Sequence, residues 1–502
     1  MDNKLVSAIK AEANKTTTEN GHFAYKSSTD KVLDLFATIG ALRTANDSRV
    51  CRLFDEAYSE NPLLATKCLF YSRDIREGLG ERKTFRTILV HAATYHPECI
   101  KPNIDLIGVF GRYDDLYSLI GTPLEDDMWA AMKAQFLEDL DNLEKDNVVS
   151  LLAKWIKTPD ASSEKTRALG ILTAKKLGYS VYDFKRLLRA LRKKINIVEA
   201  HMCANEWDQI KYSNVPSRAM YIYKNAFCRH DQEGFNNYIN AAVTGNAKIN
   251  ASTLYPYDIV HKYFKYGRYI DNNINETEEK TYEAEWRALP NYVEGENNIM
   301  IMADVSGSMY GRPIESSIGL ALYFAERNKG AFHNMFMTFQ STPKFVTVEG
   351  DTLKSKIECV ADADWGGSTN LHSAFEVLLN LAEHNRVPAE DMPKSIIIIS
   401  DMEINLATRD YSTDYEADKD FYQEISVLYA EAGYEVPTLI FWNVNSRNDT
   451  FLVDSERKNT ILCSGQSPTT FKYLISSIGS SPADMMLKVL NSERYEVITI
   501  DK

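Results

Sequence analysis

The hydrophobic periodicity of this 502-residue chain changes once along its length, and that change limits the possible folds more than any other feature. From about residue 29 to residue 261, apolar residues recur at three- and four-residue intervals, as in Lys31–Leu42, Lys83–Tyr95 and Tyr182–Leu191. This spacing predicts amphipathic helices separated by short breaks that carry Gly, Pro or Asp. Beyond about residue 297, short apolar runs alternate with helical segments. The sequence therefore predicts two parts of different structural class.

For the first part, residues 1–290, we expect an α-helical array with paired helices that stack as in HEAT-like repeats, without an exact internal period. A polar, acidic stretch at about residues 271–297 (DNNINETEEKTYEAEW and its flanks) closes this part. Its composition is typical of a linker or a surface excursion. We expect the second domain to span residues 291–502.

The second part shows the pattern of a doubly wound α/β domain. Ser395–Ser400 (SIIIIS) has four consecutive isoleucines, which is typical of a strand buried on both faces of a parallel sheet. Asn334–Phe339 and Lys344–Val348 have the pattern of a hairpin. Strands that alternate with helices predict an α/β layer structure. The further predicted strands are Asn298–Ala303, Thr438–Trp442 and Thr460–Cys463, and the predicted helices are Pro313–Arg327, Leu371–His384, Tyr415–Ala432 and Thr469–Ile478.

Polar side chains follow the predicted strands at the edge where such sheets bind ligands. Asp304, Ser306 and Ser308 come directly after the first strand, Asp401 follows SIIIIS, and Thr369 ends a Gly366-Gly367-Ser368-Thr369 run before a helix. Carboxylates and hydroxyls are hard oxygen donors, which select Mg²⁺, Mn²⁺ or Ca²⁺ over zinc or copper. A lone DxSxS motif serves equally well as a helix cap. With Thr369 and Asp401 in the right order, the sequence favours a divalent-cation site, with Mg²⁺ as the first candidate.

These residues resemble the metal-ion-dependent adhesion site of von Willebrand factor A domains, which are Rossmann-like. The resemblance implies that Ser306, Ser308 and Thr369 lie nearest the metal, while Asp304 and Asp401 act directly or through water. Relatives usually carry Gly after the last Asp, whereas Met402-Glu403 follows here. Two alternatives remain for Glu403: it adds an acceptor, or it blocks the open position on the metal.

A site of this kind recognises a ligand, because a cation with one open position accepts a carboxylate or another anionic oxygen from a partner. No general base is evident beside the motif, and the GxSxG, Walker A, kinase and Rossmann fingerprints do not occur in the sequence. We therefore expect a protein that is not an enzyme.

The helical part contains two groups of basic residues. Lys185, Arg186, Arg189, Arg192 and Lys193 lie close together with Asp183 as the only nearby acid, and Arg218, Arg229 and His230 are interleaved with tyrosines. Arginines beside aromatic rings suit phosphate forks and base stacking on RNA. The alternative is an ordinary solvated charged face.

Two compact polar turns precede these groups: the Arg73–Arg82 segment and Gly111–Asp115. In the first, we favour a structural interpretation in which Arg73, Arg76 and Arg82 pair with the adjacent Asp74, Glu77 and Glu81.

Three segments of the helical part, taken in order, resemble the TROVE-type helical module. They are LFDEAYSENPLLATKCLFYSRDIREGLGERKTF, VFGRYDDLYSL and VPSRAMYIYKNAFCRHDQEGFNNYI. The resemblance covers nearly the whole chain and is to a largely uncharacterised branch of the Ro ribonucleoprotein autoantigen superfamily. It implies a ring of helical repeats that binds small structured RNAs or free RNA ends, without assigning individual contacts.

The composition limits where RNA can bind and where the protein works. A net charge of −13 argues against general polyanion binding, so RNA would need a local basic surface. Seven scattered cysteines without a CxxC pair are typical of reduced thiols in a cytosol-like compartment. The N-terminus has no apolar signal region. We expect a soluble cytoplasmic protein, in the host cytosol if the protein is viral.

Two functions follow from these observations. The first is a non-enzymatic RNA-binding scaffold of a ribonucleoprotein, whose A domain recruits an anionic group of a partner through the cation. The alternative is a protein–protein assembly adaptor that uses the metal site and has no RNA role. Either is compatible with a protein partner that offers a carboxylate and with an oligomer, and neither involves a membrane.

Overall fold

The computed structural model describes residues 3–265, 269–271, 273–293, 298–361, 367–406 and 419–501. The chain forms two compact units. The sheet unit comprises Met1–Asn61 and Leu254–Ser492, and the helical unit comprises Pro62–Thr253 and Glu493–Lys502. The predicted division between residues 290 and 291 does not coincide with these units. The first 61 residues and residues 254–290 pack with the sheet, whereas the last ten residues pack with the helices.

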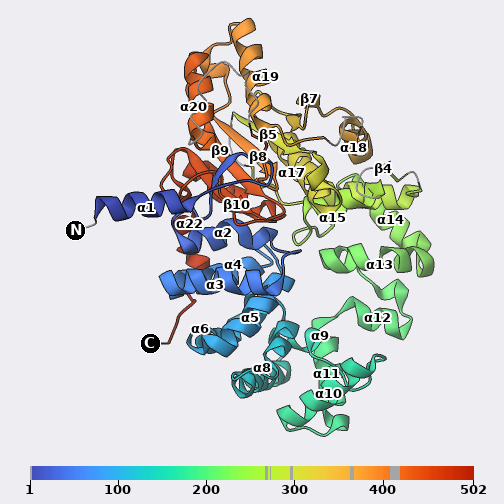
Figure 1. The fold of residues 1–502 in the computed structure, drawn as a ribbon. Coiled ribbons are helices and arrows are strands. Elements are labelled where there is room, and N and C mark those ends of the chain that lie inside the picture. Colours follow the sequence, from blue (N-terminus) through green and yellow to red (C-terminus); the bar gives the residue numbers. More distant parts are fainter. Residues whose placement is uncertain are drawn as a thin grey trace. The chain divides into compact units, whose positions relative to one another are not determined.

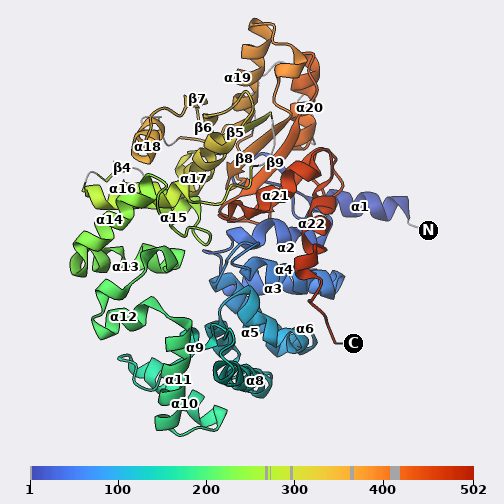
Figure 2. The ribbon, with the colours of Figure 1, turned by 180° about the vertical axis from the view of Figure 1, so that it is seen from behind.

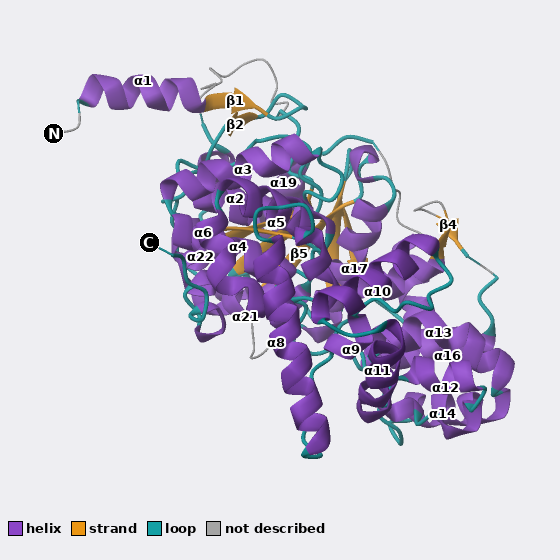
Figure 3. Cartoon of the chain, turned by 90° about the horizontal axis from the view of Figure 1, so that it is seen from below, coloured by secondary structure: helices purple, strands orange, loops and turns teal. Residues whose placement is uncertain are grey.

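The helical unit contains helices and turns, and none of its described residues forms a strand (Figure 3). The predicted helices are present, and Lys83–Tyr95 has the predicted bounds. Phe184, Leu188 and Leu191 are the buried residues of the helix that begins at Val181, at the spacing expected for one helix face. The helices are α4 Pro62–Arg73, α5 Lys83–Tyr95, α6 Pro97–Ile100, α7 Ile107–Phe110, α8 Glu125–Glu144, α9 Leu152–Trp155, α10 Glu164–Leu177, α11 Val181–Ile195, α12 Val198–Ala204, α13 Ser217–His230 and α14 Gln232–Val243.

Buried ion pairs connect the segments of the helical unit. Arg73 Nε lies 2.7 Å from Asp115 Oδ2, and both side chains are buried. Asp74 accepts hydrogen bonds from the guanidinium of Arg494 at 2.7 and 2.8 Å. The structural interpretation of the Arg73–Arg82 turn is therefore right, because its charged residues form ion pairs within the protein. The predicted pair of Arg73 with Asp74 is wrong, because Arg73 pairs with Asp115 and Asp74 with Arg494. Neighbouring helical residues point in directions about 100° apart, so Arg73 and Asp74 face different partners.

The sheet unit is built on six strands in the order β10-β9-β8-β5-β6-β7. Neighbouring strands run parallel except β6 and β7, which form the predicted hairpin. The chain adds β6 and β7 on one side of β5 and then β8, β9 and β10 on the other, so the topological switch lies between β5 and β8. This order confirms the α plus α/β class and the doubly wound topology. The strands are β5 Ile299–Asp304, β6 Met335–Phe339, β7 Lys344–Thr347, β8 Ser395–Ser400, β9 Thr438–Asn443 and β10 Thr460–Ser464.

Helices cover both faces of this sheet (Figures 1 and 2). Trp442 of β9 lies 5.4 Å, between ring centroids, from Phe324 of α17 Arg312–Arg327. The preceding residue, Phe441, lies 6.0 Å from Phe421 of α20 Phe421–Glu431. Because successive strand residues point to opposite faces, α17 and α20 pack on opposite sides of the sheet. The other helices of this region are α18 Leu353–Ala361, α19 Leu371–His384, α21 Phe471–Leu474 and α22 Pro482–Leu490.

Two of the predicted helices differ from those observed. The Tyr415–Ala432 helix begins only at Phe421 with Asp420 as its cap, and residues 415–418 lie outside the described part of the chain. The Thr469–Ile478 helix is instead a short α-helical turn, α21, between two 3₁₀ turns. Both differences concern helix ends, where Asp420 and Pro468 fix the local backbone.

The N-terminal segment packs against the edge of the sheet at β10. Its elements are α1 Lys4–Asn14, β1 Lys15–Thr17, β2 Phe23–Tyr25, α2 Lys31–Thr38 and α3 Asp47–Glu60. Just after α2, a Cβ atom on Gly40 would lie 2.7 Å from the Cα of Gly465, so this close backbone approach requires glycine. The prediction that these residues belong to the helical array is therefore wrong, because the apolar residues of α2 are buried against β10.

The predicted acidic linker contains a packed helix. Residues 254–293 form α15 Pro256–Val260, the short strands β3 Phe264–Lys265 and β4 Tyr269–Ile270, and α16 Glu276–Arg287. Asn275 caps α16 in a capping box, and Tyr282 and Trp286 of this helix are buried. Trp286 also donates a hydrogen bond to Glu326 of α17 at 2.6 Å. The apolar residues at four-residue spacing bury one face of α16 and so fix its structure in spite of the acidic composition. Residues 272 and 294–297 of the predicted linker lie outside the described residues.

Across the described ranges, no helix is both long enough and apolar enough to cross a membrane.

Candidate metal centre

The predicted metal ligands meet at the topological switch of the sheet. Asp304 is the last residue of β5, and Asp401 directly follows β8, the neighbouring strand. Thr369 lies two residues before α19. Asp304, Ser306, Thr369 and Asp401 are all buried. The carboxyl ends of the two strands on either side of a topological switch are where doubly wound sheets bind ligands.

A chain of hydrogen bonds links four of the five predicted ligands. Thr369 Oγ1 donates to Ser306 Oγ at 3.1 Å, and Ser306 Oγ lies 3.2 Å from Ser308 Oγ. The backbone N–H of Ser306 donates to Asp304 Oδ1 at 2.8 Å. The backbone N–H of Gly307 donates to the carbonyl of Gly367 at 3.2 Å, which joins the two loops. Gly366, the other glycine predicted to shape this loop, lies outside the described residues.

The electrostatics of the cluster favour a bound cation. Burial and the charge of Asp401 raise the pKa of Asp304, and hydrogen bonds from Ser306 and Ser400 oppose this effect. Asp401 Oδ2 is buried and accepts no hydrogen bond from any described residue. Its nearest cationic neighbour is the Arg447 guanidinium, with Nη2 at 3.1 Å. Two adjacent buried carboxylates with three hydroxyls form an all-oxygen donor set, which fits a hard divalent cation.

Two residues that sequence reasoning missed support the ligands. Ser400 Oγ donates to Asp304 Oδ2 at 2.5 Å, which ties the end of β8 to the end of β5. Asn405 accepts a hydrogen bond from the backbone N–H of Thr369 at 3.2 Å, and its own N–H donates to the carbonyl of Thr369 at 2.9 Å. The position of Ser400 directly before Asp401 was an available signal, whereas nothing in the sequence pairs Asn405 with Thr369.

The structure explains the departure at Met402. Met402 has a φ of 65°, in the left-handed region that glycine adopts without strain. Glycine would meet this backbone requirement without strain, whereas here a methionine adopts the conformation and its side chain is buried.

The side chain of Glu403 binds residues outside the ligand cluster, whereas its backbone N–H donates to Asp401 Oδ1 at 3.2 Å. Its carboxylate accepts hydrogen bonds from the backbone N–H of Glu19 at 2.6 Å, from Asn448 at 2.9 Å and from Thr450 at 3.3 Å. These contacts tie the segment after β8 to the turn between β1 and β2 and to the loop after β9. Glu403 is thus a buried anchor for two loops, and its donors come from these loops rather than from the ligand residues.

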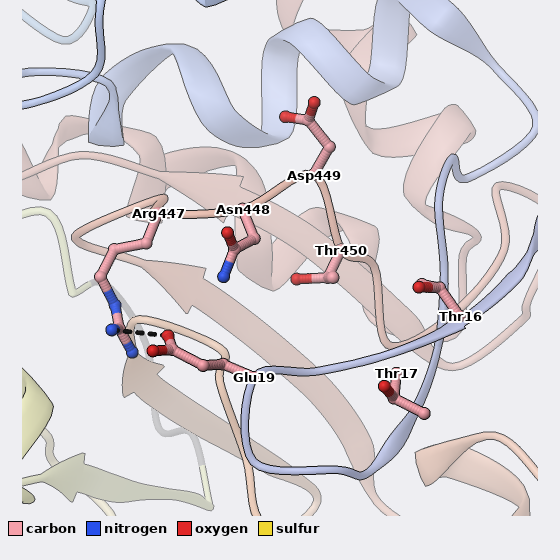
Figure 4. A pocket seen from close by; sticks show the side chains of 7 residues that line it. All are labelled: Thr16, Thr17, Glu19, Arg447, Asn448, Asp449 and Thr450. Carbon is pink, nitrogen blue, oxygen red and sulfur yellow. Dashed lines mark ion pairs between the residues drawn. The ribbon is translucent and has the colours of Figure 1, made fainter.

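A polar cavity of about 640 Å³ lies beside the cluster in the sheet unit (Figure 4). Figure 4 shows the Arg447 side chain directed toward Glu19, with which it forms an ion pair at 2.6 Å. Because Arg447 also pairs with Asp401, this arginine connects the cavity to the predicted metal ligands. Arg49 of α3 fixes the loop that carries Arg447 by donating to the carbonyls of Ser446, Arg447 and Asn448. The cavity is lined by Thr16, Thr17, Glu19, Arg447, Asn448, Asp449 and Thr450.

The basic residues of α11 divide into paired and unpaired groups. Arg192 donates to the carbonyls of Ala153 and Ile156 at 2.8 and 3.2 Å, so its side chain stabilises the helical unit. Lys185 pairs with Asp160 at 3.1 Å and Arg186 with Asp183 at 3.5 Å. Asp183 is therefore not the only acid near this helix, because the fold brings Asp160 beside it. Arg189 and Lys193 are exposed, and neither has an ionic partner within the described ranges.

The second predicted RNA-binding group lies on α13. Arg229 is exposed, and His230 stacks on Trp207 with ring centroids 4.3 Å apart. Arg218 lies over the ring of Tyr221 at 5.0 Å. His230, which follows the exposed Arg229 in the sequence, therefore forms a stacked aromatic pair with Trp207.

The chain is similar to proteins of two families of unknown function. A model described as "Domain of unknown function (DUF2828)" matches residues 18–146 and 124–298, and one described as "Domain of unknown function (DUF7788)" matches residues 298–496. "Uncharacterized protein L728" of Acanthamoeba polyphaga mimivirus is 26% identical over 520 residues, which cover 95% of this chain and 87% of that protein. The Deinococcus radiodurans RO (RSR) protein, a solved structure, aligns with a TM-score of 0.44 and 13% identity over 93% of this chain and 100% of its own. Since the two DUF2828 matches together span more than half of the 502 residues, the chain belongs to the DUF2828 family.

Proposed function

We propose that the sheet unit is a metal-dependent recognition module of the von Willebrand factor A type. A divalent cation, with Mg²⁺ as the first candidate and Mn²⁺ or Ca²⁺ as the others, would be held by Asp304, Ser306, Ser308, Thr369 and Asp401. The observation that carries this proposal is the meeting of two buried carboxylates and three hydroxyls at the topological switch. When bound, the cation supplies a Lewis-acidic position for an anionic oxygen of a partner.

The preference for an anionic partner rests on the cation rather than on the charges around it. Asp304 and Asp401 together balance the two charges of the cation, and the three hydroxyl ligands are neutral. Arg447 lies 3.1 Å from Asp401, and Glu19 offsets its charge at 2.6 Å. An open position on the cation selects an anionic oxygen, so we infer that the module recognises an acidic group of a partner.

For the helical unit we propose RNA binding, which together with the metal-dependent module makes a ribonucleoprotein scaffold. Support comes from Arg189, Lys193 and Arg229, which are exposed and have no ionic partner among the residues that the structure describes. The stacked pair of Trp207 and His230 adds an aromatic surface at the end of α13, the helix that also carries Arg229. Exposed cations beside aromatic rings suit single-stranded RNA. The alternative is an assembly adaptor with no RNA role.

Purification of the full chain with and without EDTA tests both roles at once. The metal-dependent role predicts that a protein partner copurifies in Mg²⁺, is released by EDTA and is absent with the Asp304→Ala variant. The RNA role predicts salt-sensitive RNA that EDTA does not release and that is lost from the Arg189→Glu, Lys193→Glu double variant. Lys145→Glu is the matched control, because Lys145 is exposed and pairs only with the neighbouring turn at Asp141. Retention of every bound component by both variants would contradict both roles.

A further inference from the structure

A cluster of cationic side chains in the helical unit surrounds two buried carboxylates. The arginine cluster, as we name it, consists of Arg73, Arg82, Arg86, Arg112 and Lys157 around Asp114 and Asp115. Its members come from α4, from the start of α5, and from the segments around residues 112 and 157. The cluster includes both polar turns that the sequence singled out, and the metal-dependent function does not use it.

The buried carboxylates of Asp114 and Asp115 bind the arginine side chains of the cluster. Arg86 Nε lies 2.6 Å from Asp115 Oδ1, and Arg73 Nε lies 2.7 Å from the other oxygen of the same carboxylate. Arg112 binds Asp114 in a bidentate manner, with Nε at 2.9 Å and Nη2 at 2.6 Å from its two oxygens. Asp115 is fully buried and Asp114 is 8% exposed. These pairs fix the orientation of the three guanidinium groups.

The cluster carries more positive charge than its carboxylates neutralise. Lys157 Nζ is a further cation 3.6 Å from Asp114, so four cationic side chains share two carboxylates before Arg82 is included. The side chains of Arg86, Arg112 and Lys157 are 27–31% exposed, while both aspartates lie beneath them. The charged groups of Arg86, Arg112 and Lys157 therefore reach the solvent, whereas Arg73, at 3% side-chain exposure, is buried with the two aspartates.

Arg82 is the member of the cluster without an ion pair. It is exposed and has no ion-pair or hydrogen-bond partner among the side chains that the structure describes. Partial burial and the nearby charges of Arg112 and Arg86 lower its pKa, and the charge of Asp114 opposes this effect only in part, so the surrounding cations destabilise its charged form. An anion bound at this point would relieve that repulsion.

The local backbone and one aromatic ring add to the same surface. Arg82 immediately precedes the 13-residue helix α5, and its side chain gives the first turn no cap hydrogen bond. The hydroxyl of Thr84, in that first turn, is buried and has no partner among the described residues. Helix N-termini stabilise anions through their free N–H groups and the helix dipole. The guanidinium of Arg112 lies 3.8 Å from the ring centroid of Trp155, which holds its plane in place.

We propose that the arginine cluster binds a phosphate group, as inorganic phosphate or as the monoester of a small molecule, with Arg82 and Arg112 as the contacting residues. A phosphate dianion accepts hydrogen bonds on three oxygens and matches the planar fork of arginine. It also offsets more of the excess charge than one carboxylate does. All of its residues belong to the helical unit, whereas the predicted metal ligands belong to the sheet unit.

Calorimetric titration of the full chain with inorganic phosphate, AMP and adenosine at constant ionic strength tests the proposal. We expect saturable binding of phosphate or of AMP, and no binding of adenosine. The two anions distinguish a site for free phosphate from one for a phosphomonoester. Arg82→Gln should weaken binding about tenfold or more, which is the loss of one charge-assisted hydrogen bond, and Arg82→Lys should restore part of it.

Arg167→Gln is the matched control, because Arg167 is an exposed arginine of the same unit whose side chain donates to the carbonyls of Ala161 and Ser162, outside the cluster. Its affinity for phosphate should equal that of the wild type. Equal binding by the Arg82→Gln and wild-type chains, an equal loss in Arg167→Gln, or the lack of saturable binding by either anion would overturn the proposal. Circular dichroism of each variant checks its fold, and Arg82→Gln should preserve the fold because no described side chain depends on Arg82.

Discussion

The buried carboxylate of Asp401 lies 3.1 Å from the guanidinium of Arg447, which pairs at the same time with Glu19 from the N-terminal segment. A residue that the motif assigns to a cation is thus partly neutralised by a side chain of the chain itself. Arg49 of α3 holds the loop that presents Arg447. The N-terminal segment therefore takes part in building the predicted metal centre, some 380 residues away in the sequence.

The pairing of Arg447 with Asp401 predicts competition between this arginine and a metal ion. Arg447→Gln removes a positive charge beside Asp401, so we expect Mg²⁺ to bind about five- to tenfold more tightly, or roughly 1 kcal/mol. Isothermal titration calorimetry measures the change. Arg386→Gln is the control, because Arg386 is an exposed arginine of the sheet unit that contacts no predicted ligand. Unchanged or weaker Mg²⁺ binding in Arg447→Gln would rule out the competition.

Met402 allows a test of backbone strain against burial. Its left-handed φ of 65° costs about 1 kcal/mol, which glycine would relieve. The buried methionine side chain, however, contributes about 2–3 kcal/mol through removal of apolar surface from water. We therefore expect Met402→Gly to lower the free energy of unfolding by about 1–2 kcal/mol, as measured by denaturant titration of the sheet unit. A more stable glycine variant would show that the strain outweighs the burial.

The buried pair of Arg73 and Asp115 should matter far more than a surface pair. Asp115→Asn leaves the guanidinium of Arg73, at 3% side-chain exposure, without its counter-charge, which costs about 3–5 kcal/mol. Asp141 and Lys145 form an exposed pair on α8, and Asp141→Asn should cost less than about 0.5 kcal/mol. Hydrogen–deuterium exchange of α4 and α5 reports on the helical unit alone. Equal protection of these helices in the two variants would contradict the prediction.

The carboxylate of Asp484, in the first turn of α22, should make the stability of the fold depend on pH. Hydrogen bonds from Lys458 and Ser481 lower the pKa of Asp484 to about 2. A lowered folded-state pKa contributes stability that is present above the unfolded pKa, near 4, and is lost as the pH falls toward 2. Since the side chain is half exposed, we expect less than about 1 kcal/mol. Between about pH 4 and about pH 2, the free energy of unfolding of Asp484→Asn should therefore fall less than that of the wild type. Identical profiles of stability against pH would show that Asp484 is not responsible.

The sequence predicted the elements of the fold well where periodicity was strong. Ser395–Ser400 and Lys83–Tyr95 have the predicted bounds because four isoleucines, and a continuous apolar face, leave few alternatives. The assignment of residues 1–61 was wrong, because helical periodicity shows which face of a helix is buried but not which partner buries it. The linker prediction failed at α16 for a related reason, since acidic composition concealed the spacing of Tyr282 and Trp286.

Of the candidate site, only the ligand residues could be predicted from the sequence, and not the contacts that support them. Asp304, Ser306, Ser308, Thr369 and Asp401 lie where alternating strands and helices place polar residues after strands, and the structure brings them together. Their supporting contacts join segments far apart in the sequence, such as Glu403 with Glu19, and no local pattern marks such pairs. The basic face of α11 shows the same limit, because Asp160 reaches Lys185 only through the fold.

Calorimetric titration of the EDTA-treated full chain with Mg²⁺ shows directly whether Asp304, Ser306, Ser308, Thr369 and Asp401 hold a divalent cation. We predict saturable binding of one ion per chain. Ser308→Ala, which removes a half-buried hydroxyl of the predicted ligand set, should weaken it about ten- to a hundredfold. Ser341→Ala removes a nearby hydroxyl that pairs with Ser368 outside that set and should leave the affinity unchanged. The absence of saturable binding, or the same affinity in Ser308→Ala as in Ser341→Ala, would show that these residues do not hold the cation.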